Sequence, residues 1–159
     1  MRYWFTTHWP RRVGEPSPDG VYVREEHLHI VDELAKGDLV VVYETARGPI
    51  RIVRHDNSLA RRVPCLRGRQ GIIAIWEIAD LCDVPSDVQE YVGRPQITWC
   101  RRASAFPVDT GLVPRARAAA LLGYSPNFLF RGYGTCRSGI KEIGQARFLS
   151  IRQELASIA

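Results

Sequence analysis

The chain has 159 residues, of which 45% are hydrophobic and 25% are charged, and this composition is typical of one globular domain. No apolar run approaches the roughly 18 residues that a membrane helix needs, and the first residues lack the basic-then-apolar layout of a signal peptide. We therefore expect a single cytoplasmic domain over residues 1–159 that does not insert into a membrane.

The net charge is +5, and arginine supplies almost all of the positive charge because Lys36 and Lys141 are the only lysines. Arginine donates paired hydrogen bonds to phosphate and stacks on bases, so this excess predicts an anionic partner. The codon bias of a GC-rich genome would raise the ratio of arginine to lysine equally well. The ratio alone therefore does not decide between the two explanations.

The four cysteines are far apart in the sequence, and they form neither a C-x-x-C pair nor a cluster with histidine: Cys65, Cys82, Cys100 and Cys136. This pattern supports neither a zinc site nor a disulfide framework. We expect reduced, mostly packed thiols, and we predict no metal and no cofactor.

The N-terminal third predicts two strands separated by a loop and a helix. A strand over Tyr3–His8 ends at a proline, and an exposed loop follows over Arg11–Gly20. Apolar residues at helical spacing predict an amphipathic helix over Arg24–Lys36, which a glycine ends. The valine-rich run Asp38–Glu44 is typical of a strand that is buried on both faces.

The middle of the chain predicts a basic segment and two further strands. Thr45–Gln70 is rich in arginine and is interpreted as a loop or hairpin, with a short edge strand over Pro49–Val53. Gly71–Ile78 is the clearest strand, Ala79–Arg94 is an acidic connection, and Gln96–Phe106 is the next strand.

The C-terminal third predicts two helices around an irregular segment. Arg115–Leu122 has strong helix propensity, and Gln145–Ile158 places Phe148, Leu149, Leu155 and Ile158 in one apolar stripe. The aromatic and glycine-rich stretch between them contains one short strand around Phe128–Phe130. Strands and helices do not alternate regularly, so we expect an α+β fold in which a mixed sheet curls into a partial barrel with flanking helices.

Sequence motifs for catalysis are missing, since neither a nucleophile elbow, a metalloprotease motif, a P-loop nor a dinucleotide fingerprint occurs. His27 and His29 are two residues apart on the predicted helix and face different sides, which argues against shared metal binding. We therefore predict no catalytic residues.

Aromatic residues on or beside the predicted strands are the more informative feature: Trp4, Trp9, Tyr22, Tyr43, Trp76 and Trp99. Such rings can sandwich a flat base, and each stacked base contributes about 1–3 kcal/mol. An aromatic residue on a strand is more often part of the core, and we expect this of Trp4.

The opening Tyr3-Trp4-Phe5-Thr6-Thr7-His8-Trp9-Pro10 resembles the first strand of EVE domains. The order of the later segments is also similar, from Asp19-Gly20-Val21 and Gly37-Asp38 to Gly71, Trp99 and the closing Arg137-Ser138-Gly139-Ile140. The sequence departs from the family at His8-Trp9, where Ser-Glu is common. The resemblance implies a PUA-like fold, a class that includes readers of RNA and of modified DNA bases.

By the same resemblance, the base-binding pocket would lie beside the start of the first helix, lined by His8, Trp9, Tyr22, Tyr43, Trp76 and Trp99, with Arg137 at its rim. We predict a non-catalytic module that reads a modified base of DNA or RNA, alone or beside a partner nuclease. The arginines that would hold the flanking phosphates are Arg11, Arg12, Arg61, Arg62, Arg101 and Arg102.

Two other functions stay open. One is an ASCH-like enzyme that binds or cleaves RNA and uses a lysine, glutamate or tyrosine in the same cavity. The other is a module that binds a small molecule or a protein partner.

Overall fold

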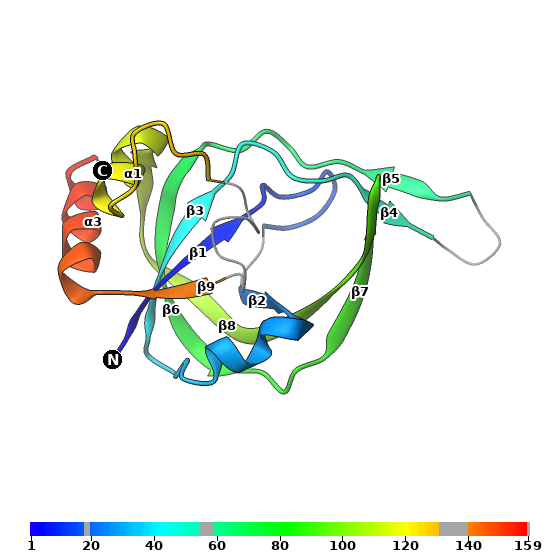
Figure 1. The fold of residues 1–159 in the computed structure, drawn as a ribbon, viewed down its shortest axis with the longest axis horizontal. Coiled ribbons are helices and arrows are strands. Elements are labelled where there is room, and N and C mark those ends of the chain that lie inside the picture. The colour runs from blue at the N-terminus through cyan, green and yellow to red at the C-terminus, as the bar shows by residue number, and fades with distance from the viewer. Residues whose placement is uncertain (18–19, 55–58, 131–139, 159) are drawn as a thin grey trace.

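The computed structural model describes residues 1–17, 20–54, 59–130 and 140–158. In these ranges the chain is a mixed α+β structure, in which nine strands form one sheet and two α-helices pack at one end (Figure 1). The pair β1–β3 is parallel and the other strand pairs are antiparallel. The α+β prediction is thereby confirmed.

The N-terminal elements are β1 (Tyr3–His8), β2 (Gly20–Arg24), the 3₁₀ helix η1 (Glu25–Val31) and β3 (Leu39–Glu44). The predicted strand β1 is confirmed with its exact bounds, and β3 begins one residue later than expected. The predicted helix over Arg24–Lys36 is wrong at its start and in its length, because β2 pairs with β8 up to Arg24 and only η1 is helical.

The middle elements are β4 (Arg51–Val53), β5 (Arg61–Val63), β6 (Gly71–Leu81), β7 (Ser86–Tyr91) and β8 (Arg94–Pro114). The basic segment forms the predicted hairpin, although β4 is not an edge strand because it pairs with both β5 and β7. The acidic connection contains an unpredicted strand, β7, which is mostly polar and has its first three residues exposed. Strand β8 extends past the predicted end, and Pro107 fits inside it where the register with β6 shifts.

The C-terminal elements are α1 (Arg115–Leu121), β9 (Ile140–Ile143) and α3 (Gln145–Ile158). Both helices are confirmed, but no strand forms at Phe128–Phe130, and β9 was not predicted. On α3 the residues Phe148 and Leu155 are buried as expected, whereas Leu149 is 51% exposed. No helix within the described ranges is long and apolar enough to cross a membrane.

The strands follow the order β5-β4-β7-β8-β6-β3-β1-β9, and β2 pairs with β8 outside this path. The sheet bends strongly but is not closed, with β5 at one end and β9 at the other. The hairpin β4–β5 projects away from the helices (Figure 1). The segments that flank this hairpin connect it to β3 and to the start of β6, where Gly71 pairs with Pro114 just before α1.

Apolar side chains pack on both faces of the sheet. One core, under α1 and α3, includes Phe5, Tyr43 and Ile75, and the opposite core includes Trp4 and Trp76. The prediction that β3 is buried on both faces is confirmed, because its residues alternate between the two cores. Trp4 is 2% exposed, as expected of a core residue. Its indole nitrogen donates a 3.0 Å hydrogen bond to the buried carboxylate of Asp38.

Candidate functional site

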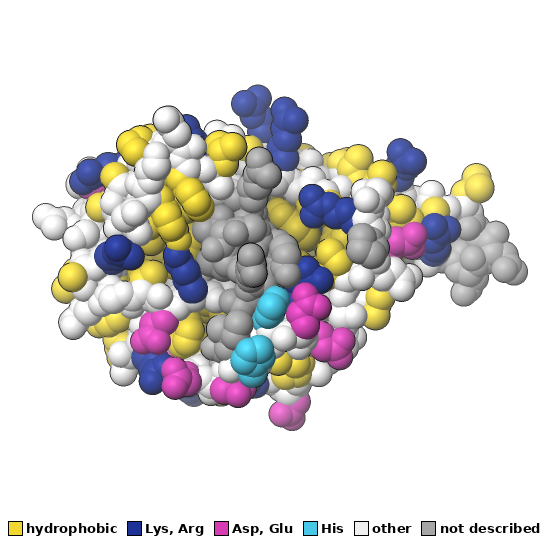
Figure 2. Space-filling view, in the orientation of Figure 1, with side chains coloured by type: hydrophobic (Ala, Val, Ile, Leu, Met, Phe, Trp, Pro, Cys, Tyr) yellow, Lys and Arg dark blue, Asp and Glu magenta, His cyan; other side chains and the backbone are white. Residues whose placement is uncertain are grey.

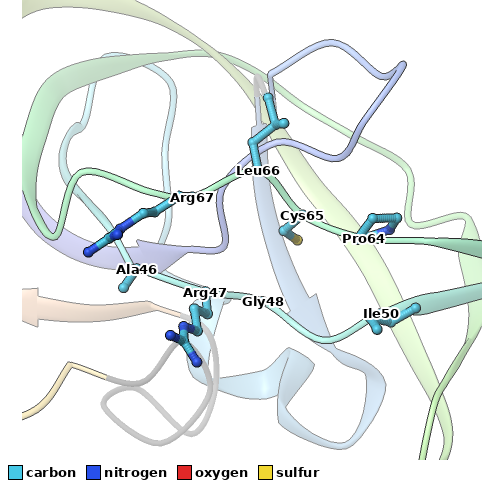
Figure 3. Close-up of a pocket in the computed structure, with 8 residues that line it drawn as sticks. All are labelled: Ala46, Arg47, Gly48, Ile50, Pro64, Cys65, Leu66 and Arg67. Carbon is cyan, nitrogen blue, oxygen red and sulfur yellow. The ribbon is translucent and has the colours of Figure 1, made fainter.

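A pocket of about 320 Å³ lies between the segment that follows β3 and the segment that follows β5 (Figure 3). It is lined by Ala46, Arg47, Gly48, Ile50, Pro64, Cys65, Leu66 and Arg67. The backbone N–H of Gly68 joins the two segments by donating to the carbonyl of Ala46 at 2.8 Å. These segments are close in space because β4 and β5 form a hairpin.

The residues that line the pocket are basic at one end and apolar at the other. Arg47 and Arg67 lie at one end, Ile50 and Pro64 lie at the other, and Cys65 stands between them (Figure 3). No acidic residue lines the pocket. Within the described ranges, the side chains of Arg47 and Arg67 form neither a hydrogen bond nor an ion pair, so both guanidinium groups are available to an anion.

The loop after β1 packs behind this pocket and brings Arg12 into the interior. The amide of Leu66 donates to Arg11 and the amide of Val13 donates to Pro64, at 2.9 and 3.1 Å. Arg12 is only 8% exposed. Its guanidinium donates to the Pro49 carbonyl at 2.8 Å and to the Cys65 sulfur at 3.4 Å.

No carboxylate of a described residue balances the charge of Arg12. Its hydrogen-bond acceptors are neutral, and its Nε atom is buried without a partner among the described residues. The neighbouring Arg51 forms an ion pair with Glu15. Burial, and then the positive charge of Arg12, lower the pKa of Arg51. The group of Arg12, Arg51 and Glu15 therefore carries one excess positive charge.

Cys65 joins this buried group to the pocket. Burial raises the pKa of its thiol, and the nearby charges of Arg12 and Arg51 oppose the shift only partly. The thiol is therefore protonated at neutral pH. Cys65, Cys82 and Cys100 are all free, while Cys136 lies outside the described residues.

Two aromatic rings, Trp9 and Tyr91, pack against Arg12, and a third ring, Trp99, packs on Trp9. The Trp9 ring meets Tyr91 and Trp99 edge to face, with centroids 5.4 and 5.8 Å apart, and the Arg12 guanidinium lies 5.6 Å from the rings of both Trp9 and Tyr91. A Cβ on Gly48 would lie 2.6 Å from the Cys65 sulfur and 2.9 Å from Trp9 Cβ. The aromatic group therefore lies behind Gly48 and Cys65, and none of its rings lines the pocket.

Trp99 and Tyr91 also interact through their polar atoms. Burial raises the pKa of the Tyr91 hydroxyl, and the charge of Arg12 and the indole N–H of Trp99 act in the opposite direction. The Trp99 nitrogen makes no hydrogen bond of good geometry within the described ranges. We interpret the pair as a close polar contact and not as a formed hydrogen bond.

His8 and Trp76 form a separate pair, with ring centroids 5.1 Å apart and an edge-to-face arrangement. Burial lowers the pKa of His8 to about 4, so the imidazole is neutral at physiological pH. Trp76 is 8% exposed and belongs mainly to the core. The structure thus places two predicted pocket residues together but leaves little of the indole surface free.

The other predicted pocket residues lie elsewhere. Tyr22 lies on β2, and the Arg101 guanidinium is 6.0 Å from the centre of its ring. Tyr43 is 1% exposed and stacks on Phe130 in the core beneath the helices. Tyr43 and Trp76 face opposite sides of the sheet, so these two rings cannot wall one cavity. Arg137 lies outside the described residues.

The predicted phosphate-binding arginines differ in exposure. Arg61 and Arg62 are exposed on β5, and their side chains have no polar partner in the part of the chain that the structure describes. Arg11 is exposed and donates to the Glu15 carbonyl, whereas Arg101 and Arg102 are half-buried on β8. Arg12 is used inside the protein, so its side chain does not reach a phosphate at the surface.

Basic side chains are spread over the face of the molecule in Figure 2, and several of them lie along its upper rim. This rim includes the segments that follow β3 and β5, other Lys and Arg side chains lie toward the helices, and Asp and Glu lie mostly lower, around η1. Sequence reasoning identified the basic segment but missed Arg47, Cys65 and Arg67 as neighbours in one pocket. The available signal was a glycine next to each arginine, Gly48 and Gly68, which lets the backbones approach closely.

No protein-family model matches the chain, and no curated protein matches it. The described ranges contain no cluster of His, Cys, Asp and Glu that could hold a metal ion.

Proposed function

We propose that this chain is a non-catalytic nucleic-acid-binding module of the PUA-like class that resembles EVE domains. The observation that carries the proposal is a group of exposed arginines around the β4–β5 hairpin, which form no ion pair with other described residues: Arg47, Arg61, Arg62 and Arg67. Arg54, on the same hairpin side of the molecule, is by contrast paired with Glu90. Guanidinium groups left free on one rim are suited to a chain of phosphates.

The fold supports the same proposal. We interpret the bent, open, mixed sheet as the partial barrel of a PUA-like domain, with α1 and α3 packed on one face. The resemblance of the first strand to EVE domains covers β1 and the loop that contains Trp9. This loop also brings Arg12 beneath the pocket, so the part of the chain with the resemblance packs directly behind the candidate site.

In the proposed mode of binding, arginines hold the phosphates and aromatic side chains read a base, which is a modified one by the resemblance. Trp9 and Trp99 are the rings best placed for this, because both are partly exposed and Trp9 packs against Gly48, the residue after Arg47. His8, Tyr22 and Trp76 remain secondary contacts in this proposal. Tyr43 takes no part, because it faces the other core.

Salt dependence tests the proposal. Four arginines that displace counterions from single-stranded nucleic acid give a slope of about −3 for log K against log salt. The measurement is fluorescence anisotropy with labelled single-stranded DNA and RNA, with and without modified bases, between low and moderate salt. The double variant Arg61→Gln/Arg62→Gln is expected to weaken binding at least tenfold and to reduce the slope.

The matched control is Arg117→Gln/Arg152→Gln, which removes the same charge from arginines that are paired with Glu154 and Asp109 near the helices. This control is expected to change affinity less than threefold. Absence of binding to every oligonucleotide at low salt, or equal losses in both double variants, would reject the proposed function.

One observation favours the ASCH-like enzyme as a second candidate. Lys141 on β9 donates a hydrogen bond to the Tyr124 hydroxyl, and burial, together with the charge of Arg147, lowers the pKa of this lysine. A lowered pKa makes a lysine a better proton-transfer group than an ordinary lysine. Cleavage of RNA that disappears in both Lys141→Ala and Tyr124→Phe would support the enzyme, and an inactive wild-type protein would reject it.

A further inference from the structure

The buried charge of Arg12 lies directly behind the pocket. Its guanidinium bonds to the Cys65 sulfur, which lines the pocket, and to the carbonyl of Pro49, which lies between two lining residues. Buried charges in proteins are normally paired, because removal from water is costly. The described residues offer Arg12 no carboxylate, so an anion in the pocket would supply the missing negative charge.

Two further guanidinium groups stand at one end of the same pocket. Arg47 and Arg67 come from different segments, and neither is neutralised by a described residue (Figure 3). Planar guanidinium groups bind phosphate oxygens in pairs, whereas a carboxylate offers fewer acceptor atoms. A phosphate group is therefore the anion that best matches this end.

The opposite end of the pocket is apolar. Ile50 and Pro64 lie there, on the two segments that form the pocket (Figure 3). The volume of about 320 Å³ is at the small end of the range for ligand pockets. A ligand that fits has a charged group at one end, a flat and weakly polar group at the other, and the size of one nucleotide.

We propose that this pocket binds a single nucleotide, with its phosphate between Arg47 and Arg67 and its base against Ile50 and Pro64. The inference rests on the proposed function, since it treats the ligand as one unit of the bound nucleic acid. It adds a defined place on the surface where one nucleotide is held, separate from the rings of Trp9 and Trp99.

The Cys65 thiol reports on occupancy, because it lies between the two ends of the pocket. The experiment measures the rate at which iodoacetamide alkylates Cys65 at mildly alkaline pH, by mass spectrometry of the digested protein. Adenosine 5′-monophosphate is expected to slow alkylation at least fivefold, and adenosine or inorganic phosphate alone less than twofold. Cys82, which lies outside the pocket, serves as the internal control and is expected to react at an unchanged rate.

Variants test the roles of the two arginines. Arg47→Gln and Arg67→Gln are each expected to abolish most of the protection by adenosine 5′-monophosphate, and Arg117→Gln is expected to retain it. Calorimetric titration with the same nucleotide gives a second reading that does not depend on thiol reactivity. Equal protection and equal affinity in all three variants would overturn the proposal.

Oligonucleotides separate this proposal from the proposed function. A pair of oligonucleotides, one with a 5′-phosphate and one with a 5′-hydroxyl, distinguishes a terminal nucleotide from an internal one. If the pocket binds chain ends, only the oligonucleotide with the 5′-phosphate protects Cys65. Oligonucleotide binding that leaves the alkylation rate and the titration with mononucleotide unaffected would reject the pocket and preserve the proposed function. Protection by the mononucleotide without any oligonucleotide binding would preserve the pocket and reject the proposed function.

Discussion

His8, the last residue of β1, has a pKa that differs between the folded and the unfolded protein. Its ring lies against Trp76, and burial lowers its pKa to about 4. In the unfolded chain a histidine has a pKa of about 6.5. Below that pH the unfolded state therefore binds a proton that the folded state excludes.

We predict that the stability of the protein decreases as the pH falls from about 6.5 to 4. The His8 contribution to this loss is about 2 to 3 kcal/mol between pH 7.5 and 4.5, which follows from the two pKa values. Above pH 7 the contribution vanishes, because His8 is neutral in both states. The measurement is the free energy of unfolding in urea at the two pH values.

The comparison variant is His8→Gln, which cannot take up the proton and is expected to lose this part of the pH dependence. His29 is exposed on η1, so His29→Gln is expected to keep the dependence of the wild-type protein. Identical pH dependence in the wild-type protein and His8→Gln would contradict the lowered pKa.

Single residues show where sequence reasoning succeeds and where it fails. The burial of Trp4 could be predicted, because a tryptophan inside an apolar strand is usually part of the core. Arg11 and Arg12 are indistinguishable in the sequence, yet the first is exposed and the second is buried. The difference depends on how the loop packs against Cys65, which lies 53 residues further along the chain.

The two segments that form the pocket are joined by a close backbone contact. A Cβ on Gly68 would lie 1.8 Å from the carbonyl oxygen of Thr45 and 2.6 Å from a ring atom of Pro10. Thr45 is itself tied to β1, because its amide donates to the His8 carbonyl at 2.9 Å. A larger residue at position 68 must therefore separate the two segments.

We predict that Gly68→Ala destabilises the protein by about 1–3 kcal/mol, the usual cost of forcing extra atoms into a packed site. Urea unfolding measures the change. Gly144→Ala is the matched control, since a Cβ at that glycine meets no atom within 4 Å. A loss of less than about 0.5 kcal/mol in Gly68→Ala would show that the segments separate easily.

Elements with a strong apolar pattern were predictable, and those without one were not. Strands β3 and β6 are buried on both faces, and their continuous apolar runs are visible in the sequence. Strand β7 has the polar sequence SDVQEY and exists because β4 and β8 pair with it on either side. The stretch around Phe128 has the opposite property. Its aromatic rings suggest a strand, but Phe128 stacks on Tyr124 and meets Phe130 edge to face instead.

At the scale of the whole molecule, the sequence predicted the class of fold and the sign of the charge. It did not predict the pocket, because the lining residues come from both sides of a hairpin and the charge behind them comes from the N-terminal loop. Periodicity and spacing describe neighbours along the chain, whereas this site depends on contacts between distant segments. The rim around β4–β5 is the one part of the candidate site that composition alone indicated.

Strand β8 is shared between several neighbours. Residues 99–104 pair with β2 along one edge, and along the other edge with β7 at first and with β6 further on. Amide hydrogens there can be released only by opening two ladders at once, so they should be the slowest to exchange with deuterium. The amide hydrogens of the short hairpin β4–β5 should exchange early. The segments that form the pocket would then open locally while the pairing of β8 with its neighbours stays intact.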